Sequence, residues 1–191
     1  MANLLKFLIF LTLFSLSILS PLQAADADSD YQILISKKNK ELSIEKEGHI
    51  VKTYHVATGK GGKGTKRRKG DSKTPLGVYR ILSFKESSRF RYFIQLDYPN
   101  LIDAWYGYKN QIIDADEFKR IASAYKKREA PPQDTALGGF IGIHGLGDTN
   151  DEKLTIHQEL NWTEGCIALT NEEILDLKKY VHVGTPVIIK E

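Results

Sequence analysis

The candidate catalytic residues of the chain lie in residues 140–171, FIGIHGLGDTNDEKLTIHQELNWTEGCIALTN. We interpret the rest of the chain around this segment. They include the only cysteine of the protein, Cys166, which follows Gly165 and precedes an apolar Ile-Ala-Leu. They also include His144, which ends a short apolar run typical of a buried strand and is followed by Gly145. A thiol nucleophile needs a base within hydrogen-bond reach and backbone N–H groups that face the developing oxyanion. Cys166 and His144 are therefore the candidate nucleophile and base.

The first 24 residues have the pattern of a secretory signal peptide. Lys6 gives a positive start, residues 7–19 are mostly apolar, and Ala24 offers a small residue at a cleavage position. The apolar run is shorter than a membrane span requires, and an uncleaved N-terminal anchor is the alternative interpretation. We expect residues 1–24 to be removed. Residues 25–191 would then form one exported domain, periplasmic or secreted to the cell wall, without a membrane span.

Charge and cysteine content narrow the class of protein. The 27 Lys and Arg residues against 24 Asp and Glu give a formal net charge of +3, and signal cleavage would remove only Lys6, leaving +2. This near balance predicts no nucleic-acid partner. A lone cysteine cannot form an intramolecular disulfide, so in an oxidising compartment Cys166 is either a buried inert thiol or a reactive one. The turn-like Trp162-Thr163-Glu164 before Gly165 favours the reactive interpretation.

Short β-prone runs separated by turn residues make up most of the remaining chain, and only two segments have clear helix signals. A capping box begins each helix, with Glu117 three residues after Asp114 and Glu173 three residues after Thr170. There are no internal repeats and no second domain boundary, which predicts a mainly β (α+β) single domain. The expected strands are residues 31–36, 41–45, 50–58, 78–83, 92–97 and 187–190, and the clearest helix is 114–128.

Two segments have no regular pattern. Residues 59–73, GKGGKGTKRRKGDSK, are rich in glycine and basic residues, and we interpret them as a flexible basic loop. They do not form a phosphate-binding loop, because Gly64 is followed by Thr65 and not by Lys-Ser/Thr. Residues 98–110 are rich in aromatic side chains, and we expect them to be irregular.

Four motifs in this order resemble the L,D-transpeptidase catalytic (YkuD-type) family. They are Ile-His-Gly at 143–145, Thr-x-Gly-Cys-Ile at 163–167, Thr-Pro-x-Gly at 74–77 and the Thr-Asn-Glu-Glu helix start at 170–173. The resemblance spans residues 31–189, nearly the whole mature chain. It implies mixed β-sheets in a sandwich with two or more flanking helices, and an exported enzyme that acts on peptidoglycan stem peptides without a cofactor or metal.

The resemblance also assigns roles to individual residues. Cys166 would attack the bond between the L-centre of a diamino acid and the terminal D-amino acid, forming a thioester that an amine of a second stem resolves. His144 would be the base, the carbonyl of Gly145 would orient its ring, and the N–H groups of Gly165 and Cys166 would bind the oxyanion. The candidate substrate contacts are Trp162, Thr163, Glu164 and His157. For His157, nine residues before the thiol, a surface or loop-packing role is favoured.

Two positions depart from the family pattern, and several functions stay open. Glu164 stands where a histidine is usual, and Ala168 stands where an arginine or another polar residue is usual. These differences bear on the acyl acceptor and on carboxylate recognition more than on the nucleophile.

The same thioester would serve a transpeptidase, an L,D-carboxypeptidase, or a hydrolase of cross-links or of a wall-linked protein.

Two other classes remain. One is a non-catalytic wall-binding module that uses the basic loop. The other is a zinc hydrolase built on His144, His157 and either Cys166 or Asp148, although no pair of these residues has the spacing of a zinc motif.

Overall fold

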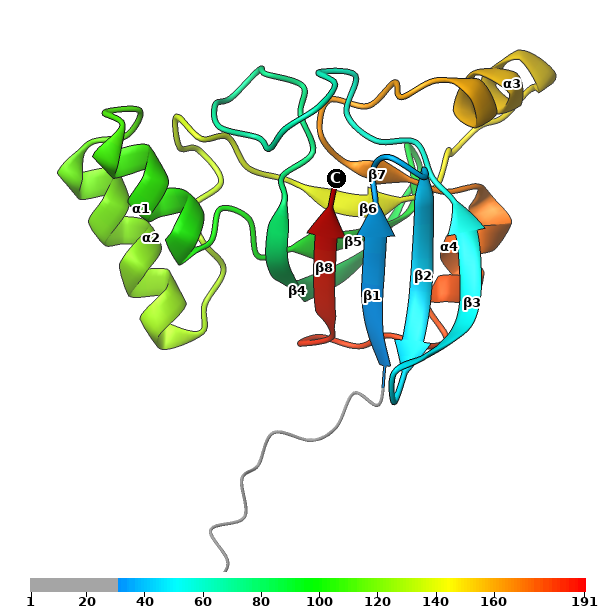
Figure 1. Cartoon of the computed structure of the whole chain (residues 1–191), viewed down its shortest axis with the longest axis horizontal. Helices are drawn as coiled ribbons and strands as arrows, with labels where there is room; N and C mark the ends of the chain where they lie inside the picture. The colour runs from blue at the N-terminus through cyan, green and yellow to red at the C-terminus, as the bar shows by residue number, and fades with distance from the viewer. Residues whose placement is uncertain (1–30) are drawn as a thin grey trace, which may run out of the picture.

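The structure is a computed structural model in which residues 31–191 are described. Within these residues the chain forms eight strands and four helices (Figure 1). The strands are β1 (Tyr31–Ser36), β2 (Glu41–Lys46), β3 (His49–His55), β4 (Gly77–Ser87), β5 (Arg91–Leu96), β6 (Gly142–His144), β7 (Ile167–Ala168) and β8 (Pro186–Lys190). The helices are α1 (Leu101–Lys109), α2 (Ala115–Lys127), α3 (Asp151–Glu159) and α4 (Asn171–Leu177).

One mixed sheet holds all eight strands, in the order β3-β2-β1-β8-β4-β5-β6-β7. The pairs β1–β8 and β6–β7 are parallel, and the other pairs are antiparallel. Figure 1 shows β1, β2, β3 and β8 in front of β5, β6 and β7, with β4 connecting the two halves. Isolated bridges from Ala57 to Ala168 and from Gly59 to Thr163 join the outer ends of the sheet. The sheet therefore curls around a single core.

Side chains from both halves of the sheet fill this core. In β2, Leu42 and Ile44 are buried and alternate with more exposed neighbours, which is the pattern of a strand with one face on the core. Each fully buried aliphatic side chain stabilises the fold by about 1.5–3 kcal/mol. The fully buried aliphatic residues of the strands include Ile33, Leu42, Ile44, Ile94, Leu96, Ile143, Ile167 and Val187.

The predicted mainly β domain with mixed sheets and flanking helices is confirmed. The six predicted strands correspond to β1–β5 and β8, although some of their ends differ. The predicted helix 114–128 is α2, and the Asp114 side chain accepts hydrogen bonds from the N–H groups of Asp116 and Glu117. The predicted capping box of Thr170 and Glu173 begins α4.

The expectation that residues 98–110 are irregular is wrong, because most of them form α1. Asn100 caps this helix in a capping box with Asp103. The helix packs beside α2 at one end of the sheet (Figure 1). Its aromatic residues Trp105 and Tyr108 remain exposed. A helix without a continuous apolar face has a weak hydrophobic period, so its apolar residues do not indicate a helix. The capping box was the signal in the sequence that could have indicated this helix.

The predicted signal peptide lies outside the described residues. Among residues 31–191, none of the helices combines the length and the apolar character that a membrane crossing requires.

Candidate active site

The pairing of β6 with β7 brings Cys166 and His144 to the same face of the sheet. The two strands run parallel, with Ile143 opposite Ile167 and His144 opposite Ala168. Side chains alternate between faces along a strand, so Cys166, two residues before Ala168, points to the same side as His144. Ile143 and Ile167 point to the other side and are fully buried in the core. The thiol and the imidazole are therefore diagonal neighbours above a rigid, buried strand pair.

The His144 ring is buried and has a fixed orientation. Its Nδ1 lies 2.7 Å from the carbonyl oxygen of Gly145, and because a carbonyl only accepts, Nδ1 carries the proton. The rings of Phe90 and Trp162 lie 4.3 and 6.1 Å from the His144 ring, measured between centroids. Burial lowers the pKa of His144 to about 4, and the charge of Arg89 acts in the same direction. At neutral pH the imidazole is neutral, and Nε2 is the nitrogen that is free to accept a proton.

The Cys166 thiol is half-buried and donates a hydrogen bond to the Phe140 carbonyl oxygen over 3.4 Å. Burial raises the pKa of Cys166 to about 11, although the Gly142 N–H and the charge of Lys66 act in the opposite direction. No hydrogen bond joins the thiol to His144 among the described residues. The resting pair is therefore a neutral thiol beside a neutral imidazole, not a thiolate–imidazolium ion pair.

Phe140 is a feature of the site that the sequence did not indicate. Its φ is +53°, a left-handed conformation that costs a non-glycine residue about 1–3 kcal/mol. The Gln133 side chain holds this turn, since its Oε1 accepts from the Phe140 N–H and its Nε2 donates to the carbonyls of Tyr98 and Pro131. The Phe140 ring is 65% exposed. The strained turn thus aims a carbonyl at the thiol and leaves an aromatic ring in solvent beside it.

The turn before the thiol is organised by Thr163. Its hydroxyl donates to the Cys166 carbonyl over 2.6 Å and accepts from the Gly165 N–H over 3.2 Å. The Gly165 N–H is therefore engaged, whereas the Cys166 N–H has no hydrogen-bond partner among the described residues. Gly165 has φ +131°, and a Cβ there would lie 2.8 Å from the Lys73 carbonyl oxygen. Both the conformation and the close contact require glycine at this position.

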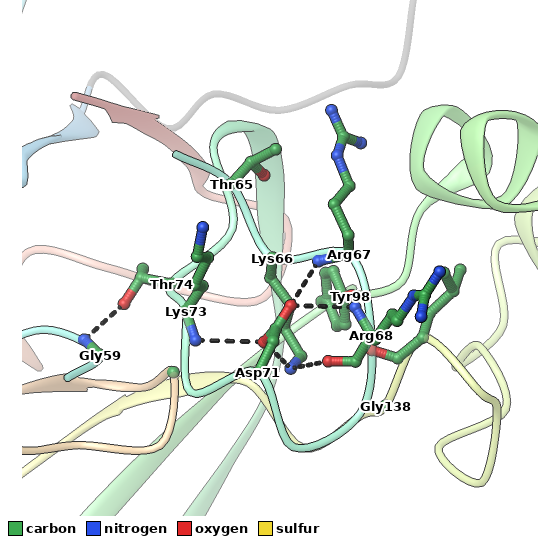
Figure 2. Close-up of polar contacts among 12 residues, drawn as sticks. Gly59, Thr65, Lys66, Arg67, Arg68, Asp71, Lys73, Thr74, Tyr98 and Gly138 are labelled. Carbon is green, nitrogen blue, oxygen red and sulfur yellow. Dashed lines mark hydrogen bonds and ion pairs between the residues drawn. The ribbon is translucent and has the colours of Figure 1, made fainter. Parts of the chain in front are cut away.

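The basic loop forms the wall behind Gly165, and it is more ordered than predicted. Figure 2 shows its residues gathered around the Asp71 carboxylate. That carboxylate accepts from the backbone N–H groups of Arg67, Arg68 and Lys73, and from the buried Lys66 Nζ at 2.8 Å. These bonds hold the pKa of Asp71 below its usual value. The expectation of a flexible loop is wrong because one carboxylate satisfies four donors and fixes the chain around it.

The chain was compared with known proteins and structures. The sequence profile of the L,D-transpeptidase catalytic domain (YkuD) matches residues 30–189. The chain belongs to this family. No curated protein sequence matches it significantly.

Solved structures show the same L,D-transpeptidase fold. Bd1075 of Bdellovibrio bacteriovorus is 23% identical with a TM-score of 0.53, and the match covers 84% of this chain and 48% of that one. The helical cell shape determining protein Pgp2 of Campylobacter jejuni, as its K307A mutant, is 23% identical with a TM-score of 0.54, covering 84% and 47%. Residues 123–326 of an L,D-transpeptidase of Xylanimonas cellulosilytica are 13% identical with a TM-score of 0.50, covering 86% and 62%. The present chain thus spans about half the length of the first two proteins.

The candidate substrate contacts of this L,D-transpeptidase-family domain differ in their placement. Trp162 and Thr163 lie within the site, beside His144 and Cys166 respectively. The Glu164 side chain is 86% exposed, and its carboxylate lies 3.9 Å from Lys60 Nζ on the basic loop. It therefore stands at the rim of the site. In the described part of the chain, no three His, Cys, Asp or Glu side chains are placed to hold a metal ion.

His157 is buried, so the surface alternative of its predicted surface or loop-packing role is wrong, whereas a packing role agrees with its contacts. It lies on α3 and is the only buried residue of that helix. Its ring meets that of His55 edge to face, with centroids 5.7 Å apart. Neither ring nitrogen has a hydrogen-bond partner among the described residues, and burial lowers the pKa of His157. In this conformation His157 packs against the domain and does not face a substrate.

Proposed function

We propose that this protein is an exported cysteine acyltransferase that acts on peptidoglycan stem peptides through a thioester on Cys166. One observation carries the proposal. The pairing of β6 with β7 in an L,D-transpeptidase-family domain places Cys166 and His144 on one face, and the Gly145 carbonyl fixes the tautomer of His144. This leaves Nε2 as the ring nitrogen that can act as the base.

In the proposed reaction, His144 Nε2 removes the thiol proton as Cys166 Sγ attacks the carbonyl carbon that follows the L-centre of the diamino acid. The unpaired N–H of Cys166 is the donor available to the oxyanion of the tetrahedral intermediate. His144 then returns the proton to the departing amine of the terminal D-amino acid, and a thioester remains. An amine of a second stem attacks this thioester, the C–S bond breaks, and the thiol regains a proton.

The neutral resting pair determines how the nucleophile is activated. Burial raises the pKa of Cys166 to about 11 and lowers that of His144 to about 4, so it favours the neutral form of both groups in the empty site. The neutral pair is therefore the favoured resting state. We infer that proton transfer accompanies attack on a bound substrate, as general-base catalysis requires.

Hydrolysis by the same thioester is the second candidate. Water in place of the amine would give an L,D-carboxypeptidase, or a hydrolase of cross-links or of a wall-linked protein. Cys166 as a residue is only partly buried, which is compatible with either water or an amine as the acceptor. The similarity to a cell shape determining protein extends the proposal to cell-wall remodelling in the periplasm or at the wall.

The test is incubation of the purified protein with tetrapeptide-stem muropeptides, followed by mass spectrometry of the products. Dimers formed with loss of the terminal D-residue would establish transpeptidation, and loss without dimers would establish carboxypeptidation. Cys166→Ala should abolish both while circular dichroism shows the fold intact, and the exposed substitution Asp116→Asn on α2 is the control that should retain turnover. Unchanged turnover in Cys166→Ala would refute the proposal. Binding to peptidoglycan that is salt-sensitive, without any Cys166-dependent product, would instead support the wall-binding module.

A further inference from the structure

The turn between β4 and β5 is packed against the segment that follows His144. Gly147 has φ +72°, and a Cβ there would lie 2.0 Å from the Arg89 carbonyl oxygen. A Cβ on Gly145 would lie 2.8 Å from the Phe90 carbonyl oxygen. The Gly145 N–H donates to the Tyr92 carbonyl over 3.2 Å. The tip of this hairpin is thus held in place beside the residue that orients the base.

This packing links three groups through Phe90. The guanidinium carbon of Arg89 lies 4.9 Å from the centroid of the Phe90 ring, and the Phe90 ring lies 4.3 Å from that of His144. The cation–π contact holds the Arg89 side chain against the ring that also contacts His144. Arg89 is exposed, and no carboxylate of the described residues pairs with it.

The cations whose charges act on the site differ in their partners. The charges of Lys66 and Arg89 both act on Cys166, and that of Arg89 also acts on His144. Lys66 Nζ is bound to Asp71 at 2.8 Å and is buried. Lys153, whose charge also acts on His144, donates to the carbonyls of Leu146 and Asp148. Among the described residues, Arg89 therefore combines a charge that acts on both Cys166 and His144 with an exposed guanidinium that no carboxylate pairs.

We propose that Arg89 binds a carboxylate of the stem peptide and holds the scissile carbonyl beside Cys166. This inference rests on the proposed function, because stem peptides carry carboxylates close to the bond that the thiol would attack. A guanidinium forms two parallel hydrogen bonds with a carboxylate, which fixes its orientation as well as its position. The exposed fork of Arg89 suits this geometry, whereas the buried ammonium of Lys66 does not.

The first test uses alkylation of Cys166 and needs no muropeptide. Iodoacetate is anionic and iodoacetamide is neutral, and with either reagent the sulfur–carbon bond forms, iodide leaves and the thiol proton passes to the buffer. We expect the ratio of the iodoacetate rate to the iodoacetamide rate to fall about threefold to tenfold in Arg89→Ala. Lys85→Ala removes an exposed cation of the same hairpin whose charge is not among the main influences on the pKa of Cys166, and should leave the ratio unchanged.

The outcomes of the alkylation test are separate from those of the turnover test. A ratio that is equal in the wild type and Arg89→Ala would overturn the anion site, whatever the protein does with muropeptides. If the ratio of the two alkylation rates is lower in Arg89→Ala and Arg89→Lys restores it only in part, the result would support a site that uses the guanidinium geometry.

The second test compares a stem peptide with free carboxylates and its fully amidated form. Arg89→Ala should raise KM for the free acid about 10- to 100-fold, with a smaller change for the amide, since a charge-assisted hydrogen bond is lost only in the first case. Lys85→Ala again serves as the matched control. Equal changes for both peptides would show that Arg89 only supports the fold of the hairpin, and would refute carboxylate binding.

Discussion

Two buried titratable groups, Asp103 and His144, should give opposite contributions to the pH dependence of stability. Asp103 lies in the first turn of α1, where it accepts from the Tyr79 hydroxyl and the Asn100 N–H. Burial nevertheless raises the pKa of Asp103 to about 6 from its ordinary 3.8. Burial lowers the pKa of His144 to about 4 from 6.5. Both groups therefore resist ionisation in the folded state.

The sign of each contribution follows from which state binds the proton. Between pH 6.5 and 4 the unfolded chain protonates His144 and the folded chain does not, so stability is lost as pH falls, by about 3 kcal/mol. Between pH 6 and 3.8 the folded chain protonates Asp103 and the unfolded chain does not, so stability is gained as pH falls, by about 3 kcal/mol. In the wild type these two contributions nearly cancel.

Substitution of either residue should reveal the contribution of the other. We expect Asp103→Asn to lose about 3 kcal/mol of unfolding free energy relative to the wild type between pH 6.5 and 4. Over the same range His144→Gln should gain about 3 kcal/mol relative to the wild type. Urea unfolding at half-unit pH intervals measures both differences. The exposed substitutions Asp116→Asn and His49→Gln are the controls. Parallel pH profiles for all five proteins would refute the assignment of these shifts to burial.

Two further predictions concern the thiol and the buried histidine. Because the pKa of Cys166 is about 11, the rate of its alkylation by iodoacetamide should rise with pH without a plateau below pH 10. At pH 7 this rate should be about 100-fold slower than for a thiol of pKa 9.0. A plateau near pH 7 would show an ion pair instead. His157→Leu should raise the unfolding free energy by about 1–2 kcal/mol at pH 7, because it removes two buried nitrogens that lack partners among the described residues. Urea unfolding with the exposed His49→Leu as control tests this, and destabilisation would contradict it.

Much of the sheet could be predicted because its strands alternate and end at recognisable turns. Leu42 and Ile44 in β2 are an example, since they point to the core while their neighbours face outward. The helix α3 lacked such a signal, because His157 is its only buried residue and its apolar Leu154 and Ile156 are partly exposed. A helix that buries one side chain leaves no periodic apolar pattern in the sequence.

The candidate site could be predicted only in part, for a different reason. The roles of Cys166 and His144 came from the family resemblance, because their placement depends on the parallel pairing of β6 with β7, which no local pattern specifies. Arg89 lies on a hairpin more than fifty residues before His144 in the sequence, and nothing near it in the sequence indicates the contact. The glycines at 145 and 147 indicate close backbone approach, but not which segment approaches.

The protonated state of the thiol is consistent with the exported location that we predict from the sequence. Oxidants and alkylating agents react with the thiolate, and a thiol whose pKa is raised to about 11 is almost entirely protonated at neutral pH. The hydrogen bond from Cys166 to the Phe140 carbonyl engages the thiol proton in the empty site. In the proposed mechanism His144 removes that proton only as the sulfur attacks a bound substrate. The nucleophile is therefore protected from oxidants and alkylating agents until a substrate occupies the site.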